Sequence, residues 1–289
     1  MLQVNEAYEE CRLITKREAK NFFYAFITLP PAKRKAIYAT YAFCRYCDDA
    51  VDEDIPTERK LDALFRLREN LAAAYQGEAN GAVFTALAHA VQAYNIPQIY
   101  LQEVINGVEM DLTKSRYETF DELRLYCYRV ASAVGLTCLE IFGYNDSKAK
   151  EHAIDLGLGM QLANILRDIQ EDAERDRVYI PRQDLEQFGY SEADLLGGVL
   201  NQAQYQLMKF QVQRARNHLK KGIGLMPYLS PRSRACPSVL AHLYMRILSR
   251  IEDANYNVFN GRVRLKPTEK LLITTMTWLK SFLPQPNPT

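Results

Sequence analysis

Apolar side chains recur every three or four positions along almost the whole chain, which is the period of amphipathic α-helices. Alternating patterns typical of strands are scarce, and Pro, Gly and Asn separate the periodic segments. The spacing predicts helices over residues 6–20, 33–53, 57–76, 81–94, 97–113, 119–143, 146–173, 201–228, 232–256 and 267–283. Without repeats or long linkers, the sequence predicts one all-α domain over residues 1–289, whose Pro-rich tail, 284–289, frays.

One expected helix, 146–173, is apolar on nearly every side between Ile154 and Leu166 and carries one polar stripe, and the helix 33–53 carries a matching stripe. The stripes are Tyr41, Arg45, Asp48 and Asp52 in the helix 33–53 and Gln161, Asn164, Asp168 and Asp172 in the helix 146–173. Neighbours within a stripe are three or four positions apart, so they share one helix face. Such helices belong in the centre of a fold, where charge is costly unless it is paired or metal-bound. The sequence therefore predicts that both stripes face one interior site.

Each stripe ends in an Asp-x-x-x-Asp pair, Asp48 with Asp52 and Asp168 with Asp172. Two carboxylates on one helix face repel each other, and two facing pairs need cations between them. Hard divalent ions with oxygen ligands, Mg²⁺ above all, suit such a site. An arginine within one turn of each pair suits an anion such as a phosphate ester. The alternative for either pair taken alone is a solvated surface helix.

Composition and charge narrow the class of protein. The 289 residues are 48% hydrophobic with a net charge of +1, so nothing in the charge calls for a nucleic acid partner. No apolar run reaches the roughly 18 residues of a membrane span, and the first ten residues lack the features of a signal peptide. We expect a cytoplasmic protein without a transmembrane segment. Residues 278–283 are expected to pack against the body, with peripheral contact to lipid as the alternative.

Other cofactor sites find little support. Cys44-x-x-Cys47 has no second ligand pair of the kind a zinc site needs, and buried free thiols are the alternative. The four histidines lack the Glu-x-x-His spacing of di-iron bundles. No G-x-G-x-x-G precedes a helix after a strand-like run, so a Rossmann domain for NADPH is not predicted.

A metal-bound diphosphate inside an apolar helical bundle is typical of enzymes that ionise allylic diphosphates. Mg²⁺ and arginine stabilise the leaving diphosphate, while an apolar wall shelters the carbocation from water. The candidate lining residues are Phe22, Phe26, Phe43, Leu136, Leu139, Leu158 and Leu162. The small residues of 130–135 indicate either a channel or close helix packing.

Several segments occur in an order that carries a family resemblance. They are residues 21–26, 41–52, 107–112, 126–135, 161–172 and 177–181. With them the chain resembles the squalene/phytoene synthases, which are head-to-head prenyl transferases, over residues 7–265. The resemblance implies an isoprenoid-synthase helical bundle around a central apolar cavity, with Mg²⁺ on both acidic motifs. It also implies that two prenyl diphosphates condense through a cyclopropylcarbinyl diphosphate.

The resemblance also implies roles for individual residues. The metal ligands are Asp48, Asp52, Asp168 and Asp172. The contacts to diphosphate and to the metal shell are Lys20, Arg45, Asn164, Arg167 and Arg262. The polar groups near the reacting centre are Tyr41, Tyr126 and Tyr244, and Asp111 supports the second substrate. Further substrate contacts are Phe22, Phe26, Val134 and Gln161. The alternative is that the tyrosines are core residues and that Lys20 and Arg262 are solvated.

The bulky Phe26 and Tyr38 favour a C15 chain over a C20 chain, and residues 125–136 resemble bacterial presqualene diphosphate synthases of hopanoid pathways. We therefore expect Mg²⁺-dependent condensation of two farnesyl diphosphates to presqualene diphosphate. Whether the reaction continues to squalene or dehydrosqualene, and whether the protein uses NADPH, stays open. The alternative within the class is a phytoene synthase acting on two geranylgeranyl diphosphates. A non-catalytic scaffold relative is the alternative from another class, although the four carboxylates argue against it. The Asp-x-x-x-Asp form of the second acidic motif, Asp168 to Asp172, argues against chain elongation.

Overall fold

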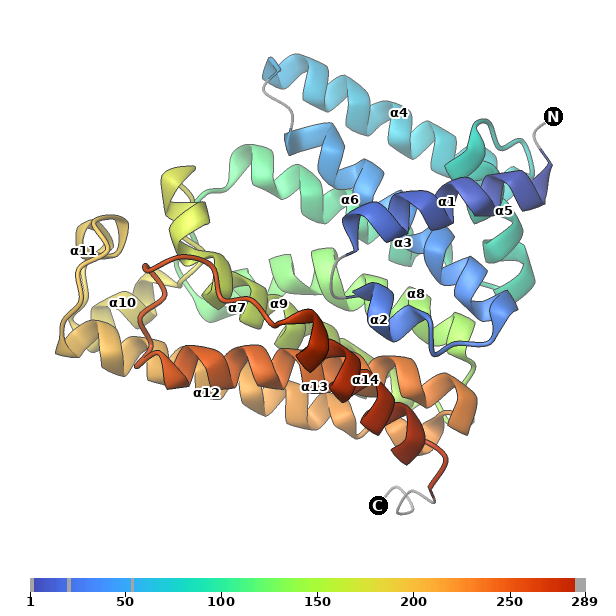
Figure 1. Ribbon diagram of the computed structural model, residues 1–289. Coiled ribbons are helices and arrows are strands. Elements are labelled where there is room, and N and C mark those ends of the chain that lie inside the picture. Colours follow the sequence, from blue (N-terminus) through green and yellow to red (C-terminus); the bar gives the residue numbers. More distant parts are fainter. Residues whose placement is uncertain (1–2, 20–21, 53–54, 284–289) are drawn as a thin grey trace.

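The computed structural model describes residues 3–19, 22–52 and 55–283, and of Asp52 it describes the backbone alone. Within these ranges every regular element is a helix, apart from two single-pair bridges, Arg116 with Val178 and Tyr144 with Leu229. The α-helices are α1 Val4–Glu18, α2 Phe22–Phe26, α3 Pro31–Asp52, α4 Thr57–Gln76, α5 Ala82–Tyr94, α6 Gln98–Thr113, α7 Phe120–Cys127, α8 Ala133–Phe142, α9 Ala149–Glu174, α10 Arg182–Phe188, α11 Glu192–Leu196, α12 Gln202–Ile223, α13 Pro231–Asp253 and α14 Pro267–Lys280. The all-α prediction is confirmed (Figure 1).

The long helices begin and end where the turn residues predicted. Pro31, Pro231 and Pro267 each open a helix, where the missing N–H would have no partner. Gly77 and Asn95 adopt the left-handed conformation directly after α4 and α5 and so stop both helices. The short helices α2, α10 and α11 were not predicted, because five to seven residues give too little periodicity.

One expected helix, 119–143, is instead three helical pieces that follow one another without a break. A π-helical turn, η1 (Tyr128–Ser132), connects α7 to α8. A π turn adds a residue to the helical repeat and so changes which residues of the following helix face a given neighbour. Predicted residues 201–228 likewise end earlier, since α12 stops at Ile223 and a 3₁₀ turn, η2 (Met226–Tyr228), follows.

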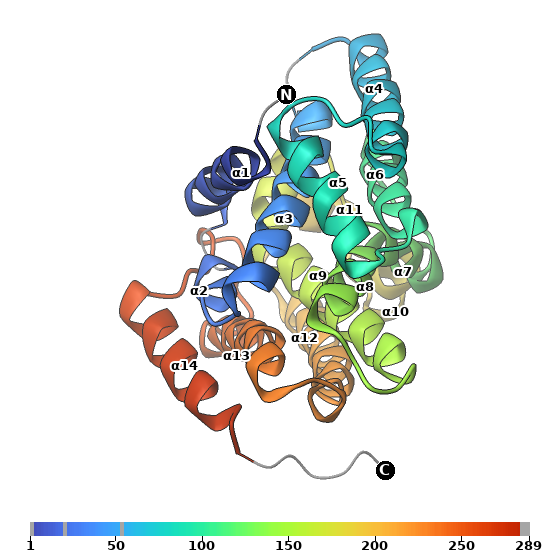
Figure 2. The ribbon, with the colours of Figure 1, turned by 90° about the vertical axis from the view of Figure 1, so that its right-hand side faces the viewer.

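Helix α9 lies at the centre of the bundle, against α7, α8, α12 and α13 (Figure 1). Its neighbours approach closely because glycines lie at the crossings. A Cβ on Gly157 would come within 2.7 Å of the Ser132 backbone in η1, and one on Gly222 of α12 within 2.6 Å of Leu156. The buried side chains form one continuous cluster around α9. Figure 2 shows α14 as the outermost helix on its side, beyond α2 and α13.

By length and composition one helical stretch of the described chain, Phe120–Phe142, is apolar enough to cross a membrane. Half of its most apolar window is buried inside the bundle, and core helices pass the same test. The stretch is therefore weak evidence for a span.

Candidate active site

Two hollows meet beside α9. The first is a polar cleft of about 410 Å³ between the ends of α3 and α9, and the second is an apolar cavity of about 290 Å³ deeper in the bundle. Asp48, Gln161 and Asn164 line both. Along α3, the cavity wall runs from Asp48 to Ile37, eleven positions or about 16 Å of helix axis. The structure thus joins a charged opening to a long apolar interior.

The cleft gathers charged residues of both signs. Its acids among the described residues are Asp48, Asp111, Asp168, Glu171 and Asp172. Its cations are Arg45, Arg167, Arg175, Arg177 and Arg262. Apart from Asp52, whose side chain is not described, the residues of both predicted stripes line this cleft or the apolar cavity that adjoins it. Arg45 itself pairs with Asp49, at 2.5 Å, on its own helix.

Two arginines hold the carboxylate of Asp168 in the cleft. Arg167 Nε donates to its Oδ1 at 2.8 Å, and Arg262 Nε lies 2.8 Å from the same oxygen. Arg262 comes from the segment before α14 and also lies 3.3 Å from Glu171. The segment is fixed nearby, where the Gly261 N–H donates to Gln170 Oε1 at 3.2 Å. The late arginine that the sequence placed at the site therefore reaches the second acidic motif.

Asp172 lies one turn further along α9. Burial, reinforced by the negative charge of Asp168, raises the pKa of Asp172 to about 7. Arg177 and Arg175 oppose this increase. A cation in the cleft would relieve the repulsion between the two carboxylates.

Asp111 of α6 accepts hydrogen bonds from two stacked tyrosines. Tyr126 donates to Oδ2 at 3.2 Å and Tyr179 donates to Oδ1 at 3.0 Å, with their ring centroids 5.2 Å apart. Burial, followed by the charge of Asp111, raises the pKa of Tyr126 well above its ordinary value. Tyr126 is therefore held as a protonated donor in the cleft.

Tyr244 of α13 contacts a residue at the junction of the cleft and the cavity. Its hydroxyl, on a side chain that is almost fully buried, donates to Asn164 Oδ1 at 3.1 Å. Asn164 Nδ2 in turn donates to Gln161 Oε1 at 3.3 Å. Both amides line the cleft and the cavity, so Tyr244 fixes their orientation without lining the cleft itself.

The wall of the apolar cavity on the α2 and α3 side is aromatic. Phe22 and Phe26 of α2 pack against Tyr41, with ring centroids 6.0 and 6.1 Å away. The rest of the lining mixes larger side chains such as Phe142, Leu156 and Met160 with small ones, which are Ala131, Gly135, Cys138, Ala153, Gly157 and Cys236. Tyr41 was expected near the reacting centre, and it does line the cavity one turn below Arg45.

Part of the expected lining is wrong. Phe43, Leu136, Leu139, Leu158 and Leu162 are buried in the core and do not line the cavity. The stripe that does line it on η1 and α8 is Val130, Val134 and Cys138, spaced four apart. Val134 was predicted as a substrate contact and lies in this wall. The small residues of 130–135 were expected either to line a channel or to allow close helix packing. Ala131 does both, since it lines the cavity and its carbonyl lies against α9.

Two predicted residues lie outside what the structure describes. Lys20 falls between the described ranges, and for Asp52 the side chain is not described. Sequence reasoning missed Arg175, Arg177 and Tyr179, which line the cleft. The signal was present, since the segment 177–181 follows the second acidic helix directly.

The donor set of the cleft suits Mg²⁺. Carboxylates of Asp48 from α3 and of Asp168 and Asp172 from α9 line one space, and oxygen ligands are those that Mg²⁺ prefers. Among the described side chains, no three of His, Cys, Asp or Glu come close enough together to hold one ion. The Mg²⁺ site therefore stays a prediction, and its residues fit the ion by chemistry.

An all-helical bundle with a charged cleft opening onto an apolar cavity defines the class of isoprenoid synthases. A solved dehydrosqualene synthase is 27% identical and superposes with a TM-score of 0.89 over 96% of this chain and 98% of its own. The family model described as squalene/phytoene synthase matches residues 15–269. The chain belongs to the squalene/phytoene synthase family, and with it to the prenyltransferases that join prenyl diphosphates head to head.

Relatives of known activity refine this picture. The 15-cis-phytoene synthase of Synechocystis sp. is 38% identical over 96% of this chain and 86% of its own. The phytoene synthase of Arthrospira platensis is 38% identical over 96% of this chain and 94% of its own.

These relatives overturn one expectation. The prediction that two farnesyl diphosphates condense to presqualene diphosphate is wrong, because near-full-length relatives at this identity are phytoene synthases. The prediction relied on Phe26 and Tyr38 as a block to longer chains. Phe26 lies in the cavity wall, whereas Tyr38 is buried against Phe26 and does not line the cavity. One of the two residues expected to block longer chains therefore does not face the cavity.

Proposed function

We propose that this protein condenses two molecules of geranylgeranyl diphosphate to phytoene, the first C40 hydrocarbon of carotenoid biosynthesis. The observation that carries the proposal is the junction at Asp48, Gln161 and Asn164, where the charged cleft opens into the apolar cavity. A prenyl diphosphate has the same two parts, a charged head and a hydrocarbon tail. The similarity to phytoene synthases supports the C20 chain over the C15 chain.

The reaction removes two diphosphates and two protons. The first diphosphate departs with its bonding electrons, and the allylic cation alkylates the C2–C3 double bond of the second substrate. Loss of a proton closes the cyclopropane ring. The second diphosphate then departs, the cation rearranges, and loss of another proton leaves the central double bonds of a linear tetraterpene. Because no hydride is added, this balance requires no NADPH.

The described residues divide this work between them. Arg167 and Arg262 lie beside Asp168 in the cleft, where a diphosphate would meet guanidinium groups that bind it in a bidentate manner. Asp111 accepts hydrogen bonds from Tyr126 and Tyr179 and would take up a released proton through the tyrosine hydroxyls. The aromatic and aliphatic cavity walls exclude water from the cation.

Mg²⁺ held by Asp48, Asp52, Asp168 and Asp172 would neutralise charge that develops on the leaving diphosphate. Divalent-ion dependence is therefore part of the proposal. Removing the metal with a chelator is expected to abolish turnover, and adding Mg²⁺ back is expected to restore it.

The test is incubation of the purified full chain with geranylgeranyl diphosphate and Mg²⁺, without NADPH, followed by lipid extraction and mass analysis. A C40 hydrocarbon with release of two diphosphates per product is the expected result. A competition between equal amounts of C15 and C20 diphosphates is expected to yield mainly the C40 product. A C30 product alone would refute the chain length, and no diphosphate release under any condition would refute the enzyme.

A further inference from the structure

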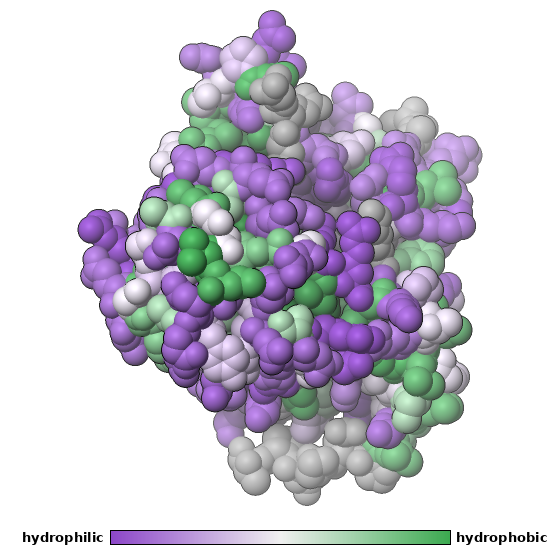
Figure 3. Space-filling model, turned by 60° about the vertical axis from the view of Figure 1, so that its left-hand side comes forward, coloured by the Kyte–Doolittle hydropathy of each residue, from purple (hydrophilic) through white to green (hydrophobic). Residues whose placement is uncertain are grey.

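Two groups of exposed apolar side chains on the described surface contain three or more neighbours in the sequence. Leu196, Val199 and Leu200 form a patch over α11 and the loop after it, which is surrounded by hydrophilic residues (Figure 3). The second group lies on the outer face of α14 and the turn that follows it. Its members are Leu271, Leu272, Met276, Trp278, Leu279, Phe282 and Leu283. The sequence predicted that residues 278–283 pack against the body, and this prediction is wrong for Trp278, Leu279, Phe282 and Leu283, which are exposed.

Helix α14 turns hydroxyl side chains toward the body and large apolar side chains toward the outside. Thr274, Thr277 and Ser281 face the body and are 5%, 7% and 4% exposed, whereas Leu272 and Leu279 on the other side are 60% and 57% exposed. A helix at a protein surface normally buries its apolar stripe and shows its hydroxyl groups to water. Thr274 Oγ1 moreover has no hydrogen-bond partner among the described residues. Burial in the body therefore does not explain the leucines of α14.

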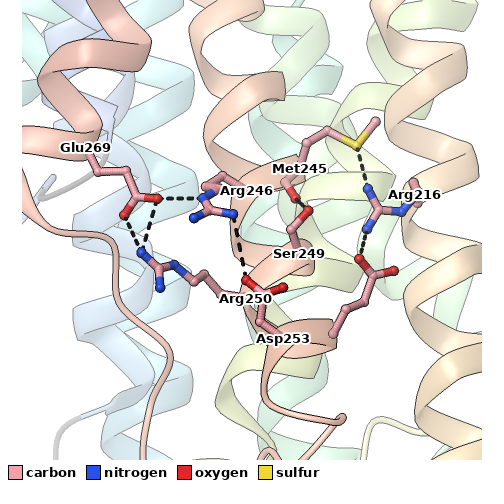
Figure 4. Close-up of polar contacts among 8 residues, drawn as sticks. Arg216, Met245, Arg246, Ser249, Arg250, Asp253 and Glu269 are labelled. Atoms are coloured by element: carbon pink, nitrogen blue, oxygen red, sulfur yellow. Dashed lines mark hydrogen bonds and ion pairs between the residues drawn. The ribbon is translucent and has the colours of Figure 1, made fainter.

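Ion pairs hold α14 in this orientation (Figure 4). Arg246 Nε of α13 donates to Glu269 Oε1 at 2.5 Å, and Arg250 Nη2 donates to Glu269 Oε2 at 3.2 Å. The hydrogen bond from Arg246 holds the pKa of Glu269 below its ordinary value, so this carboxylate stays charged and tied to α13. The acidic group at the start of α14 is thus turned toward the body and neutralised there.

The charges that remain around the outer face are basic. Arg264, Lys266 and Lys280 are exposed at the two ends of α14, and the helix contains no acid besides Glu269. If two copies paired through α14 about a two-fold axis, basic groups would meet only basic groups. Anionic lipid headgroups would complement them, with the leucines buried below the headgroup level. Trp278, the single tryptophan of the chain, is 41% exposed and packs edge-on against Phe282.

We propose that the outer face of α14, from Leu271 to Leu283, docks this protein onto a lipid bilayer that contains anionic headgroups. The helix packs on α2 and α13, which also supply Phe22, Phe26 and Leu240 to the apolar cavity. Docking would therefore place the membrane beside the wall of the cavity. If the proposed function holds, a hydrocarbon product would have a short path to lipid.

The test uses the full chain and vesicles, without substrate. Vesicles of equimolar phosphatidylcholine and phosphatidylglycerol are titrated in, and vesicles of phosphatidylcholine alone provide the uncharged comparison. Since Trp278 is the single tryptophan, its emission reports on α14 directly. We expect a blue shift and co-sedimentation with the anionic vesicles, both weakened by high salt.

Matched variants identify the face. Leu272→Glu with Leu279→Glu is expected to weaken vesicle binding about tenfold or more, because each leucine no longer enters the apolar layer. Val199→Glu with Leu200→Glu adds the same charge on the other apolar patch and is expected to leave binding within about twofold. Thermal melting followed by circular dichroism checks that both variants are folded. Equal losses in the two variants, or no binding of the parent protein to either vesicle, would overturn the proposal.

The molar mass in solution separates lipid from a second copy. Light scattering of the lipid-free protein is expected to give a concentration-independent mass that the α14 variant does not change. A dimer that dissociates in the α14 variant alone would make another copy the partner and overturn the lipid assignment. Because no step of these measurements involves turnover, their outcome is independent of whether the proposed condensation occurs.

Discussion

The polar cleft and the apolar cavity share Asp48, Gln161 and Asn164 but have walls of opposite chemistry. The cleft has arginines and carboxylates from four parts of the chain, while Asp48 is the one charged residue among the described residues that line the cavity. Charged groups act on a charged head whatever tail follows it, and an apolar wall responds to the size of the tail. The difference leads us to expect that turnover rate and chain-length preference can be changed separately by substitutions in the two hollows.

The largest effect is expected in the cleft. Asp48→Asn removes one carboxylate that faces both hollows, and we expect turnover to fall about a hundredfold to a thousandfold. The loss should be equal for C15 and C20 diphosphates, because the head is common to both. Single-turnover release of diphosphate measures it. The control is Asp62→Asn on α4, whose exposed carboxylate pairs with Arg66, and a comparable loss there would contradict a specific role for Asp48.

A second prediction addresses the cavity. Ala153→Leu fills space in the wall of α9 eleven positions below Asn164, so the end of the longer tail should be excluded first. We expect kcat/KM for the C20 diphosphate to fall about 10- to 200-fold relative to the C15 diphosphate. Competition assays with both substrates measure the ratio. An equal fall for both chain lengths would mean that the cavity wall also positions the head.

The sequence could predict the cleft far better than the cavity, for a physical reason. The stripes on α3 and α9 are polar residues on otherwise apolar helices, and the periodicity itself identifies the face. Between residues 130 and 139 no charged residue marks the face, so Leu136 and Leu139 were assigned to the lining although Val134 and Cys138 of this stretch line it. The π turn η1 shifts the register just before them.

Other parts of the fold were beyond sequence reasoning for different reasons. The ten long segments were predicted because Pro and Gly mark their ends, while α2, α10 and α11 are too short to show a period. The apolar residues of α14 predicted burial, because the pattern gives the two faces of a helix but not which face points to water. The aromatic block at Phe26 misled the choice of substrate, since a sequence does not reveal which residues face the cavity.

A third prediction concerns the crossing of α9 with η1, where Gly157 packs against the backbone of Ala131 and Ser132. A Cβ on Gly157 would meet Ser132 Cα at 2.7 Å and the Ala131 carbonyl oxygen at 2.9 Å, and backbone atoms cannot move aside easily. Gly157→Ala should therefore cost about 1–3 kcal/mol of unfolding free energy. Thermal melting should show a drop of roughly 2–4 °C for each kcal/mol. Gly197→Ala, where φ is −80° and the nearest atom to a Cβ is 3.1 Å away, should change the melting temperature less.

The smallest effect on turnover is expected at the junction of the cleft and the cavity. Tyr244→Phe removes the hydroxyl that donates to Asn164 Oδ1 at 3.1 Å, and Asn164 lines both the cleft and the cavity. One such hydrogen bond contributes about 0.5–1.5 kcal/mol, so turnover should fall about two- to tenfold, equally for both chain lengths. Tyr190→Phe, whose hydroxyl donates to two carbonyl groups outside the site, should lower stability and leave turnover unchanged. A fall of about a thousandfold in Tyr244→Phe would place its hydroxyl at the reacting carbons instead, while a change in chain-length preference would show that head and tail are coupled through Asn164.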